Sequence, residues 1–396
     1  MTSLRSTVGA TAAAGDAGTP GTPVALQAGV NLIGYTRAEM GIGEGARSDA
    51  KALDAANEPF GIVCFQSHNP SRMTDLSWEH KEMQAAPYDV TLLHINPDHA
   101  LQAINELPGE YFDGHYRIGY WAWELPEIPV DWEKAYWYFD EIWVPSHFVQ
   151  EAVAMKSPIP VVRMPHAVEV HADPSLSRSS FGLPEDCFLF LAMFDTYSRP
   201  ERKNPYGAMR VFQNAFGPDD LSAQLVLKVN NPTPDAMRRI REAIGAHRNI
   251  LLLDKVYSRT QVNALIGCCD CYVSLHRSEG FGFGPAEAMA LGKAVMATAW
   301  SGNIDYMRPG NSIGIDYTLV KLAEDYGPYK KGQTWAEPDE AHATRAMQQL
   351  AGDPALSRQL GENARATIAA EFAPLPVGEL MRKRLAAIRQ IRANIR

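Results

Sequence analysis

The sequence lacks any long hydrophobic run, because no stretch of 18 consecutive apolar residues occurs among its 396 residues. A membrane-spanning helix needs about 20 such residues, so no segment is predicted to cross a bilayer. Residues 1–23 also lack the apolar core of a secretory signal and are rich in Ala, Gly and Thr, so we expect a disordered leader there. Together these absences favour a cytoplasmic protein.

Cysteine is also scarce, with five residues, an odd number that suits a reducing compartment. Three of them, Cys268, Cys269 and Cys271, are too close together for the usual zinc spacing, and no second pair completes a site. We interpret them as small buried residues at the start of a strand, and we expect no metal site in this segment.

Positive charge is in deficit, since 37 Lys and Arg stand against 46 Asp and Glu, for a net charge of −9. An acidic surface repels a phosphate backbone, which argues against nucleic acid as a partner. The deficit hides a basic end, because residues 381–396 contain six Lys or Arg and no acid. Residues 377–396 are predicted to form a basic amphipathic helix, which either packs on the protein or makes peripheral contact with an anionic membrane. Its apolar positions are Leu385, Ile388, Ile391 and Ile395.

Short apolar runs alternate with helix-like segments along the chain, a pattern typical of parallel sheets covered by helices. Strands are predicted at residues 28–33, 60–65, 90–95, 117–121, 142–144, 161–164, 188–194, 224–229, 250–253, 272–275 and 294–297. The polar stretch 171–186 is interpreted as a linker, and Ser258 with Gln261 predicts a capping box that opens a helix. We therefore predict two Rossmann-like, doubly wound α/β domains, at residues 24–170 and 187–376, that face a central cleft.

The densest cluster of unusual residues runs from Ser274 to Lys293, and its pattern predicts a strand end, a glycine-rich turn and a helix. Glycines at 280, 282 and 284 let backbone N–H groups approach a ligand, and a helix start favours an anion. Glu279 precedes the turn and Glu287 follows it. Taken alone, these carboxylates are also compatible with a solvated loop residue and a helix-start charge. At the carboxyl end of a strand, two carboxylates can instead bind sugar hydroxyls.

This region resembles the signature of glycosyltransferase family 4. The matching segments are Ser-Glu-Gly-Phe-Gly and Glu-Ala-Met-Ala-Leu-Gly-Lys, with seven residues between Glu279 and Glu287. Members of that family are retaining enzymes of the GT-B fold, and residues 30–305 follow their layout. The resemblance implies that Glu279 lies beside the donor sugar of a nucleoside-diphosphate sugar and that Glu287 binds the ribose. The turn residues implied to contact the sugar and phosphates through their backbone are Gly280, Phe281 and Gly282.

A leaving diphosphate needs positive charge, and cations follow the first strand predicted in the second domain. Lys203 resembles the pyrophosphate lysine of the family. The arginine that the family commonly has at this strand end is absent, so we expect Arg202 or Arg199 to supply the second cation, although Arg199 also suits a solvated loop. Further donor-side candidates at later strand ends are Lys228, Lys255, Val256 and Asn303.

In the first domain, a glycine loop follows the first strand and opens a helix. It superficially resembles a dinucleotide fingerprint, but its spacing differs and the second strand ends without an acid, so we do not expect a nicotinamide cofactor. The family resemblance instead places this loop across the cleft from Glu279, near the donor phosphates and the acceptor. Its candidate residues are Gly41, Gly43 and Glu44.

Two further strand ends indicate the acceptor side of the cleft. Many family members have a donor-contacting histidine where Asn96 stands here, and His94 lies on the same strand face, although a lone His94 also suits a core position. Most aromatic residues between positions 120 and 143 are predicted to be core. Two tryptophans that follow a predicted strand, Trp121 and Trp123, are acceptor-site candidates together with the neighbouring Glu124.

The sequence contains no Asp-x-Asp, the usual metal motif of the other major glycosyltransferase fold, so metal-independent transfer without a cofactor is predicted. The expected acceptor is a carbohydrate, a lipid-linked saccharide or a protein, as in polysaccharide biosynthesis, while the donor sugar and nucleobase stay open. The alternative is a non-catalytic module of the same fold that binds a glycan or a partner protein. The family architecture favours packing of the last helix onto the first domain.

Overall fold

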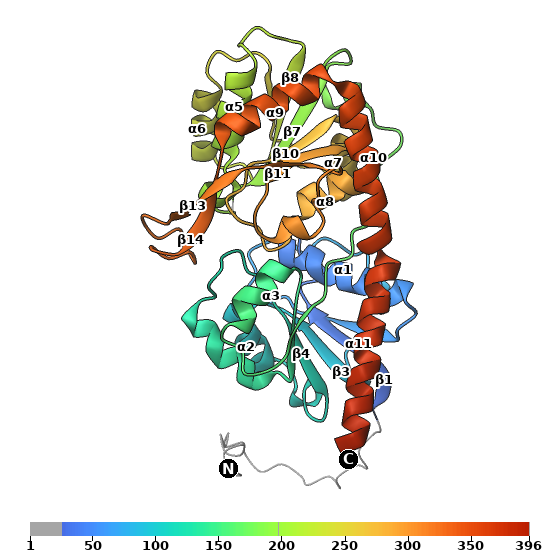
Figure 1. The fold of residues 1–396 in the computed structure, drawn as a ribbon. Coiled ribbons are helices and arrows are strands. Elements are labelled where there is room, and N and C mark those ends of the chain that lie inside the picture. The colour runs from blue at the N-terminus through green and yellow to red at the C-terminus, as the bar shows by residue number, and fades with distance from the viewer. Residues whose placement is uncertain (1–25, 197, 396) are drawn as a thin grey trace.

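Two six-stranded parallel sheets form the framework of the chain, one in each half (Figure 1). This computed structural model describes residues 26–196 and 198–395, and the leader expected at residues 1–23 lies outside them. All eleven predicted strands are present, which confirms the α/β prediction. The two domains contact each other through loops that follow the carboxyl ends of their strands, so these ends face one another.

The first sheet has the strand order β2-β1-β3-β4-β5-β6, and every neighbouring pair is parallel. Its strands are β1 (Gln27–Gly34), β2 (Phe60–Cys64), β3 (Tyr88–His94), β4 (Tyr116–Tyr120), β5 (Glu141–Val144) and β6 (Val161–Arg163). Because the order reverses at β1, the ligand crevice of such a sheet lies where β1 and β3 end, and α1 (Gly41–Ala55) begins there. The other helices are α2 (Pro97–Glu106), α3 (His147–Ala154), η1 (Glu79–Lys81), η2 (Gly109–Tyr111) and η3 (Val130–Tyr138).

The second sheet has the order β12-β11-β10-β7-β8-β9, again with parallel neighbours throughout. Its strands are β7 (Phe188–Asp195), β8 (Ala223–Asn230), β9 (Ile250–Leu253), β10 (Cys271–Ser274), β11 (Ala294–Thr298) and β12 (Ile313–Ile315). The order reverses between β7 and β10, so the loops after these two strands flank one crevice. The helices are η4 (Arg178–Phe181), α4 (Pro200–Lys203), α5 (Pro205–Ala215), α6 (Pro234–Ile244), α7 (Arg259–Cys268), α8 (Phe283–Ala290) and η5 (Gly302–Asp305).

Three strands were not predicted: β12 and an antiparallel hairpin formed by β13 (Tyr317–Lys321) and β14 (Thr334–Pro338). The residues of β13 are mostly exposed, so this strand lacks the apolar run that marked the others. The hairpin projects from the second domain toward the first (Figure 1). Leu322, Tyr329 and Trp335 belong to the hydrophobic core of the first domain, where the Tyr329 and Trp123 rings lie 5.6 Å apart. The hairpin therefore joins the two domains by apolar packing.

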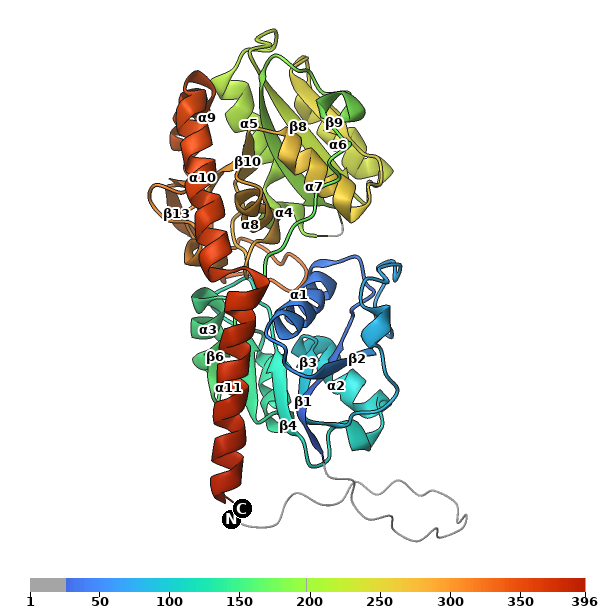
Figure 2. The ribbon, with the colours of Figure 1, turned by 90° about the vertical axis from the view of Figure 1, so that its right-hand side faces the viewer.

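Helix α11 (Pro374–Ile395) follows α9 (Glu340–Gly352) and α10 (Pro354–Glu371) and returns the chain to the first domain (Figure 2). Val377, Met381, Leu385 and Ile388 are buried in the core beside β1 and β3. At Gly378, an added Cβ would lie 2.0 Å from the carbonyl oxygen of Ala52 in α1, so only glycine fits this close helix contact. Of the predicted apolar positions, Leu385 and Ile388 are buried, whereas Ile391 is 52% exposed. The side chain of Ile395 lies outside the described residues.

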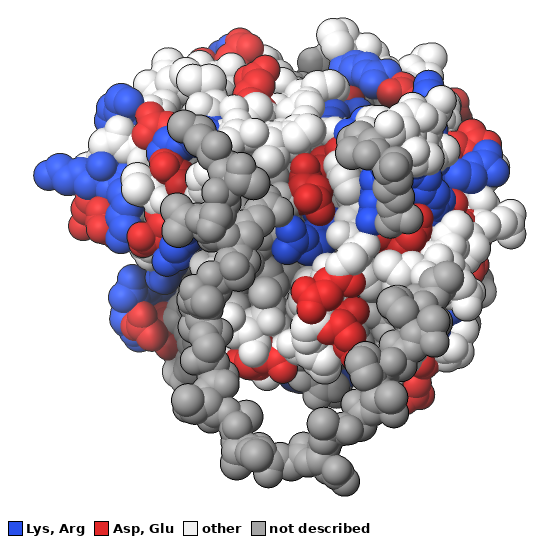
Figure 3. Space-filling view, turned by 90° about the horizontal axis from the view of Figure 1, so that it is seen from below, with Lys and Arg blue, Asp and Glu red and all other residues white. Residues whose placement is uncertain are grey.

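Cations of α11 pair with acids of the first domain. Arg384 binds the fully buried Glu141, and Arg389 Nε lies 3.0 Å from Asp89 Oδ2. On the face seen from below, basic and acidic groups of the described residues are interspersed and do not form a patch of one sign (Figure 3). Within residues 26–196 and 198–395, no helix is long and apolar enough to cross a membrane.

Candidate functional site

The reversal in the second sheet brings Lys203 and Glu279 together although they are 76 residues apart in sequence. Lys203 ends the short helix α4 after β7, and Glu279 follows β10. Lys203 Nζ donates a hydrogen bond of 2.5 Å to Glu279 Oε1. The two strand ends are tied by Asn204, whose Nδ2 donates to the carbonyl oxygen of Leu275 at 2.9 Å. A small pocket opens here, lined by Lys203, Glu279, Gly282 and the ends of β7 and β10.

Arg202 is the second cation of this site. It is buried, and its Nη1 lies 3.0 Å from Glu279 Oε2 and donates to the carbonyl oxygen of Ser278 at 2.8 Å. Burial by itself would raise the pKa of Glu279, but Lys203 and Arg202 overcome this and lower it to about 2. Glu279 is therefore a carboxylate at any physiological pH. Arg199, the other candidate, is exposed and lies beside Gly327 of the hairpin loop, not at Glu279.

The loop after β11 fixes the Glu279 turn through hydrogen bonds to its backbone. The backbone N–H of Glu279 donates to Ser301 Oγ at 2.8 Å, and its carbonyl accepts from the N–H of Gly302 at 2.9 Å. Tyr306 OH donates to the carbonyl oxygen of Gly282 at 2.7 Å. Asn303 of this loop was named from the sequence, but Ser301 and Tyr306 were missed. Ser301 is distinguished by its positive φ of 78°, which no sequence pattern predicts.

The first domain contacts the same turn from the opposite side. Ser146 Oγ donates to the carbonyl oxygen of Gly280 at 2.6 Å, and Ser278 Oγ donates to the carbonyl oxygen of Glu124. An added Cβ at Gly280 would lie 2.7 Å from the carbonyl oxygen of Trp123, so a side chain at this position would push the domains apart. The backbone around Glu279 is thus fixed by both domains.

Glu287 lies in α8, which begins at Phe283 with Gly282 as the residue before it (φ 90°). Glu287 is therefore the fifth residue of the helix and not in its first turn, so a helix-start charge does not explain it. Its side chain is 6% exposed and forms an ion pair with Arg259, the first residue of α7. Glu44 of α1 approaches the same arginine from the first domain, with 4.0 Å between Glu44 Oε1 and Arg259 Nη2.

The four donor-side candidates at later strand ends have the following surroundings. Lys228 is 1% exposed, donates to Asn230 Oδ1 at 2.7 Å, and has its pKa lowered to about 8 by burial. Lys255 and Val256 are exposed at the end of β9. Asn303 was expected to face the donor, and this is wrong: it is fully buried, its Nδ2 donates to the carbonyl oxygen of Thr298, and its Oδ1 lies 3.0 Å from His276 Nε2.

The acceptor-side candidates need correction. Trp121 and Trp123 are 0% and 3% exposed and belong to the first hydrophobic core, so their rings are not available to stack on a sugar. Their place after a strand was misleading because the chain turns back into the core there. Glu124 does lie between the domains, where its Oε2 accepts from Tyr329 OH at 3.2 Å and its Oε1 lies 3.8 Å from Arg202 Nη2.

His94 and Asn96 have local partners in the first domain. His94 is buried, with Nδ1 2.5 Å from Asp49 Oδ2 and its ring stacked on Tyr120 at 4.1 Å. Its Nε2 would lie 2.6 Å from a Cβ at Gly45, so it lies directly under the start of α1. Asn96 Oδ1 accepts from the backbone N–H of Ala122 at 2.8 Å and connects the ends of β3 and β4.

The glycines at the start of α1 differ in their surroundings. At Gly43, an added Cβ would lie 2.3 Å from the carbonyl oxygen of Ala38, so a side chain would clash with the preceding turn. At Gly41, no atom lies within 4 Å of an added Cβ. A side chain would therefore be tolerated at Gly41 but not at Gly43.

The cation pair, the glutamate turn and the two facing sheets can be compared with known proteins. Residues 199–367 match the family model of glycosyl transferases group 1. The matched segment includes Lys203, Glu279 and Glu287. No curated protein matches the chain.

Solved structures share the fold across most of the chain. HepE from Anabaena, in complex with UDP and glucose, is 13% identical with a TM-score of 0.65, covering 91% of this chain and 100% of that one. Sucrose-phosphate synthase from Thermosynechococcus elongatus is 16% identical with a TM-score of 0.65, covering 93% and 100%. TarM from S. aureus is 12% identical with a TM-score of 0.57, covering 76% and 56%. The fold is GT-B, as the sequence resemblance predicted.

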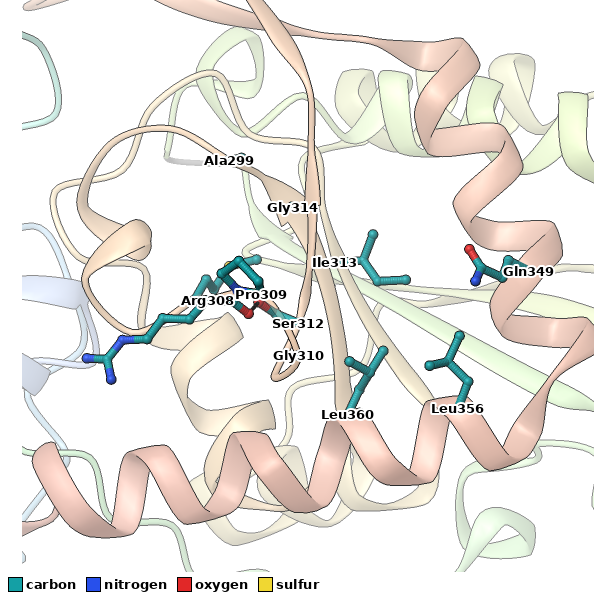
Figure 4. A pocket seen from close by; sticks show the side chains of 11 residues that line it. Ala299, Arg308, Pro309, Gly310, Ser312, Ile313, Gly314, Gln349, Leu356 and Leu360 are labelled. Atoms are coloured by element: carbon teal, nitrogen blue, oxygen red, sulfur yellow. Dashed lines mark hydrogen bonds between the residues drawn. The ribbon is translucent and has the colours of Figure 1, made fainter.

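A larger pocket, of about 610 Å³, lies elsewhere on the second domain, between β12, the loop before it and helices α9 and α10 (Figure 4). Ile313, Leu356 and Leu360 form much of its wall. Arg308 points away from it, and its Nη1 lies 2.6 Å from Glu371 Oε1. This pocket shares no residue with the Lys203 and Glu279 site.

Proposed function

We propose that the protein is a retaining glycosyltransferase that moves a sugar from a nucleoside-diphosphate sugar to a carbohydrate, lipid-linked or protein acceptor. The observation that carries this proposal is the buried Glu279 carboxylate, held by Lys203 and Arg202 at the point where the second sheet reverses. Open parallel sheets bind ligands at such points. The UDP in the complexes of HepE and TarM fits the expectation of a nucleotide-sugar donor for this chain.

In this proposal, Lys203 turns from Glu279 to the diphosphate when the donor binds. It is the cation best able to move, since its side chain is 28% exposed while that of Arg202 is 7% exposed. Arg202 stays on Glu279 and keeps it charged. Negative charge grows on the leaving phosphate during transfer, and fixed cations and the start of α8 can stabilise it without a metal ion.

The permanently charged Glu279 fits a binding and charge-stabilising role beside the sugar. Transfer with retention would proceed on one face of the sugar, where the bond to the leaving phosphate oxygen breaks as the acceptor oxygen bonds to the anomeric carbon. The leaving phosphate takes the acceptor proton. Glu279 then orients the donor hydroxyls and stabilises the positive charge that develops on the ring.

The direct test is release of the nucleoside diphosphate from UDP-, GDP- and ADP-sugars by the purified protein, with and without acceptor saccharides. We expect one donor class to react and Glu279→Gln to lower the rate about 100-fold or more while donor binding is kept. Near-wild-type transfer by Glu279→Gln would exclude the assigned role. Donor binding without any hydrolysis or transfer would instead support a non-catalytic sugar-binding module.

A further inference from the structure

Arg259 occupies a position between the two domains that the proposed reaction does not yet use. The capping box of Ser258 and Gln261 fixes the start of α7, and Arg259 is its first residue. Its guanidinium forms an ion pair with Glu287 Oε1, and Nη2 lies 4.0 Å from Glu44 Oε1 of the first domain. The side chain is 45% exposed, whereas Glu287 is 6% exposed. Arg259 thus links a buried carboxylate of one domain to a carboxylate of the other.

Glu287 would lose its charge easily without such a partner. Burial raises its pKa most strongly, Arg259 opposes this rise, and Glu44 adds to it through like-charge repulsion. Lys51 also opposes the rise but is bound to Glu44, with 3.3 Å between Lys51 Nζ and Glu44 Oε1. Arg259 is therefore the cation that contacts Glu287 directly. The titratable and charged groups that act on Glu287 from the surrounding elements are Arg259, Glu44, Lys51, Tyr272 and Tyr306, and Arg47 pairs with Glu44.

The charge on Glu287 matters for the ligand that the proposed function assigns to it. The two neighbouring hydroxyls of a ribose donate hydrogen bonds, and an ionised carboxylate accepts both of them. A protonated carboxyl offers one O–H donor in place of an acceptor, and its bonds are about half as strong. Binding of the nucleoside therefore depends on an ionised, correctly oriented Glu287.

We propose that Arg259 is a positioning residue of the nucleotide site, which keeps Glu287 ionised and oriented for the ribose and ties it to Glu44 of the first domain. This rests on the proposed function, because it takes the ribose as the partner of Glu287. The ion pair with Arg259 is formed through Glu287 Oε1. Arg259 acts through Glu287 and does not contact the phosphates.

The test measures binding of UDP, GDP and ADP and of the matching nucleosides by calorimetry between pH 6 and pH 9. For the base that the wild type binds, Arg259→Gln should weaken binding of the nucleoside and of its diphosphate equally, by about tenfold at pH 7. Raising the pH should restore most of the loss, because Glu287 then ionises without help. Arg259→Lys should retain most of the affinity. A loss confined to the diphosphate would mean a phosphate contact, and it would overturn the proposal, as would a loss that pH does not change.

A second measurement needs no ligand. The carboxyl carbon resonance of Glu287, identified by its absence in Glu287→Gln, should titrate at higher pH in Arg259→Gln than in the wild type. An unchanged titration would refute the inference even in a protein that binds nucleotides well. If the wild type binds none of the three diphosphates, the proposed function fails, while this titration still decides whether Arg259 sets the charge of Glu287.

The matched control is Arg238→Gln. Arg238 lies on α6 and pairs with Asp235 and Glu242 of the same helix, and its side chain is 58% exposed. The Arg238→Gln substitution removes one arginine charge from the same domain without changing the nucleotide site. The nucleotide affinity of Arg238→Gln and the titration of its Glu287 should equal those of the wild type. A change in either would show that the effect of Arg259→Gln comes from net charge alone.

Discussion

Replacing Gly302 with alanine should disable the Glu279 turn without touching a substrate. An added Cβ at Gly302 would lie 2.0 Å from the carbonyl oxygen of Gly280, 2.4 Å from its carbonyl carbon and 2.8 Å from the nitrogen of Phe281. Ordinary contacts begin near 3.4 Å, so the turn must move by about 1.4 Å. All three atoms are backbone atoms that no side-chain rotation can remove. The hydrogen bond from Gly302 N–H to Glu279 would be strained by the same movement.

The size of the effect follows from these contacts. Overpacking of this kind costs about 1–3 kcal/mol, and loss of the hydrogen bond adds about 1 kcal/mol. A displacement of about 1 Å in a positioned reactive group can lower a rate about 100-fold. Gly302→Ala should therefore lower the free energy of unfolding in urea by about 2–4 kcal/mol and kcat/KM for nucleoside-diphosphate release by about 100-fold.

A second glycine provides the control. Gly267 lies in α7, and no atom lies within 4 Å of an added Cβ there. Gly267→Ala should raise the free energy of unfolding by up to about 1 kcal/mol through helix propensity and leave the release rate unchanged. Wild-type stability together with a wild-type release rate in Gly302→Ala would refute the argument that this loop fixes the Glu279 turn.

Three further predictions concern the elements around the site. Leu385→Ala should lower the free energy of unfolding by about 2–5 kcal/mol in urea, since Leu385 is fully buried against the first domain, while Ile391→Ala on the exposed face of the same helix should change it by less than about 0.5 kcal/mol. Tyr329→Phe should lower the free energy of unfolding by about 1 kcal/mol, because the hydrogen bond to Glu124 is lost. Tyr329→Ala should lower it by about 3 kcal/mol or more, because the ring is also lost from the core. Equal values for the two variants would contradict packing of the hairpin on the first domain. The ion pairs of Glu279, whose pKa is about 2, stabilise the fold fully above about pH 4.5 and lose this contribution as the pH falls toward 2, so acid denaturation should be less steep in Glu279→Gln than in the wild type.

The sequence by itself determined the strands, the glycine turn and the start of α7. The eleven predicted strands were recognisable because a parallel strand covered on both faces is a continuous apolar run. The capping box of Ser258 and Gln261 was recognisable because its contacts span three residues. Lys203 and Glu279 were also singled out, since each follows a strand end and resembles a residue of the family signature. All of these features depend on residues close to one another along the chain.

Only the tertiary structure decided which cation joins Glu279 and which residues support it. The sequence offered both Arg202 and Arg199 as the second cation, but in the structure Arg202 contacts Glu279 and Arg199 lies beside the hairpin. The hairpin itself was missed because its strands are short and partly exposed. Trp121 and Asn303 were assigned to the ligand because both follow strands, yet Trp121 packs in the first hydrophobic core and Asn303 is buried against Thr298 and His276.

The meeting of Arg259, Glu287 and Glu44 has no sequence signal at all. Arg259 and Glu287 are 28 residues apart, and Glu44 belongs to the other domain. Whether such residues meet depends on the order of strands in each sheet and on the contact between the two sheets. Local patterns determine the elements of this protein, and the order of the strands decides which of their ends come together to form a site.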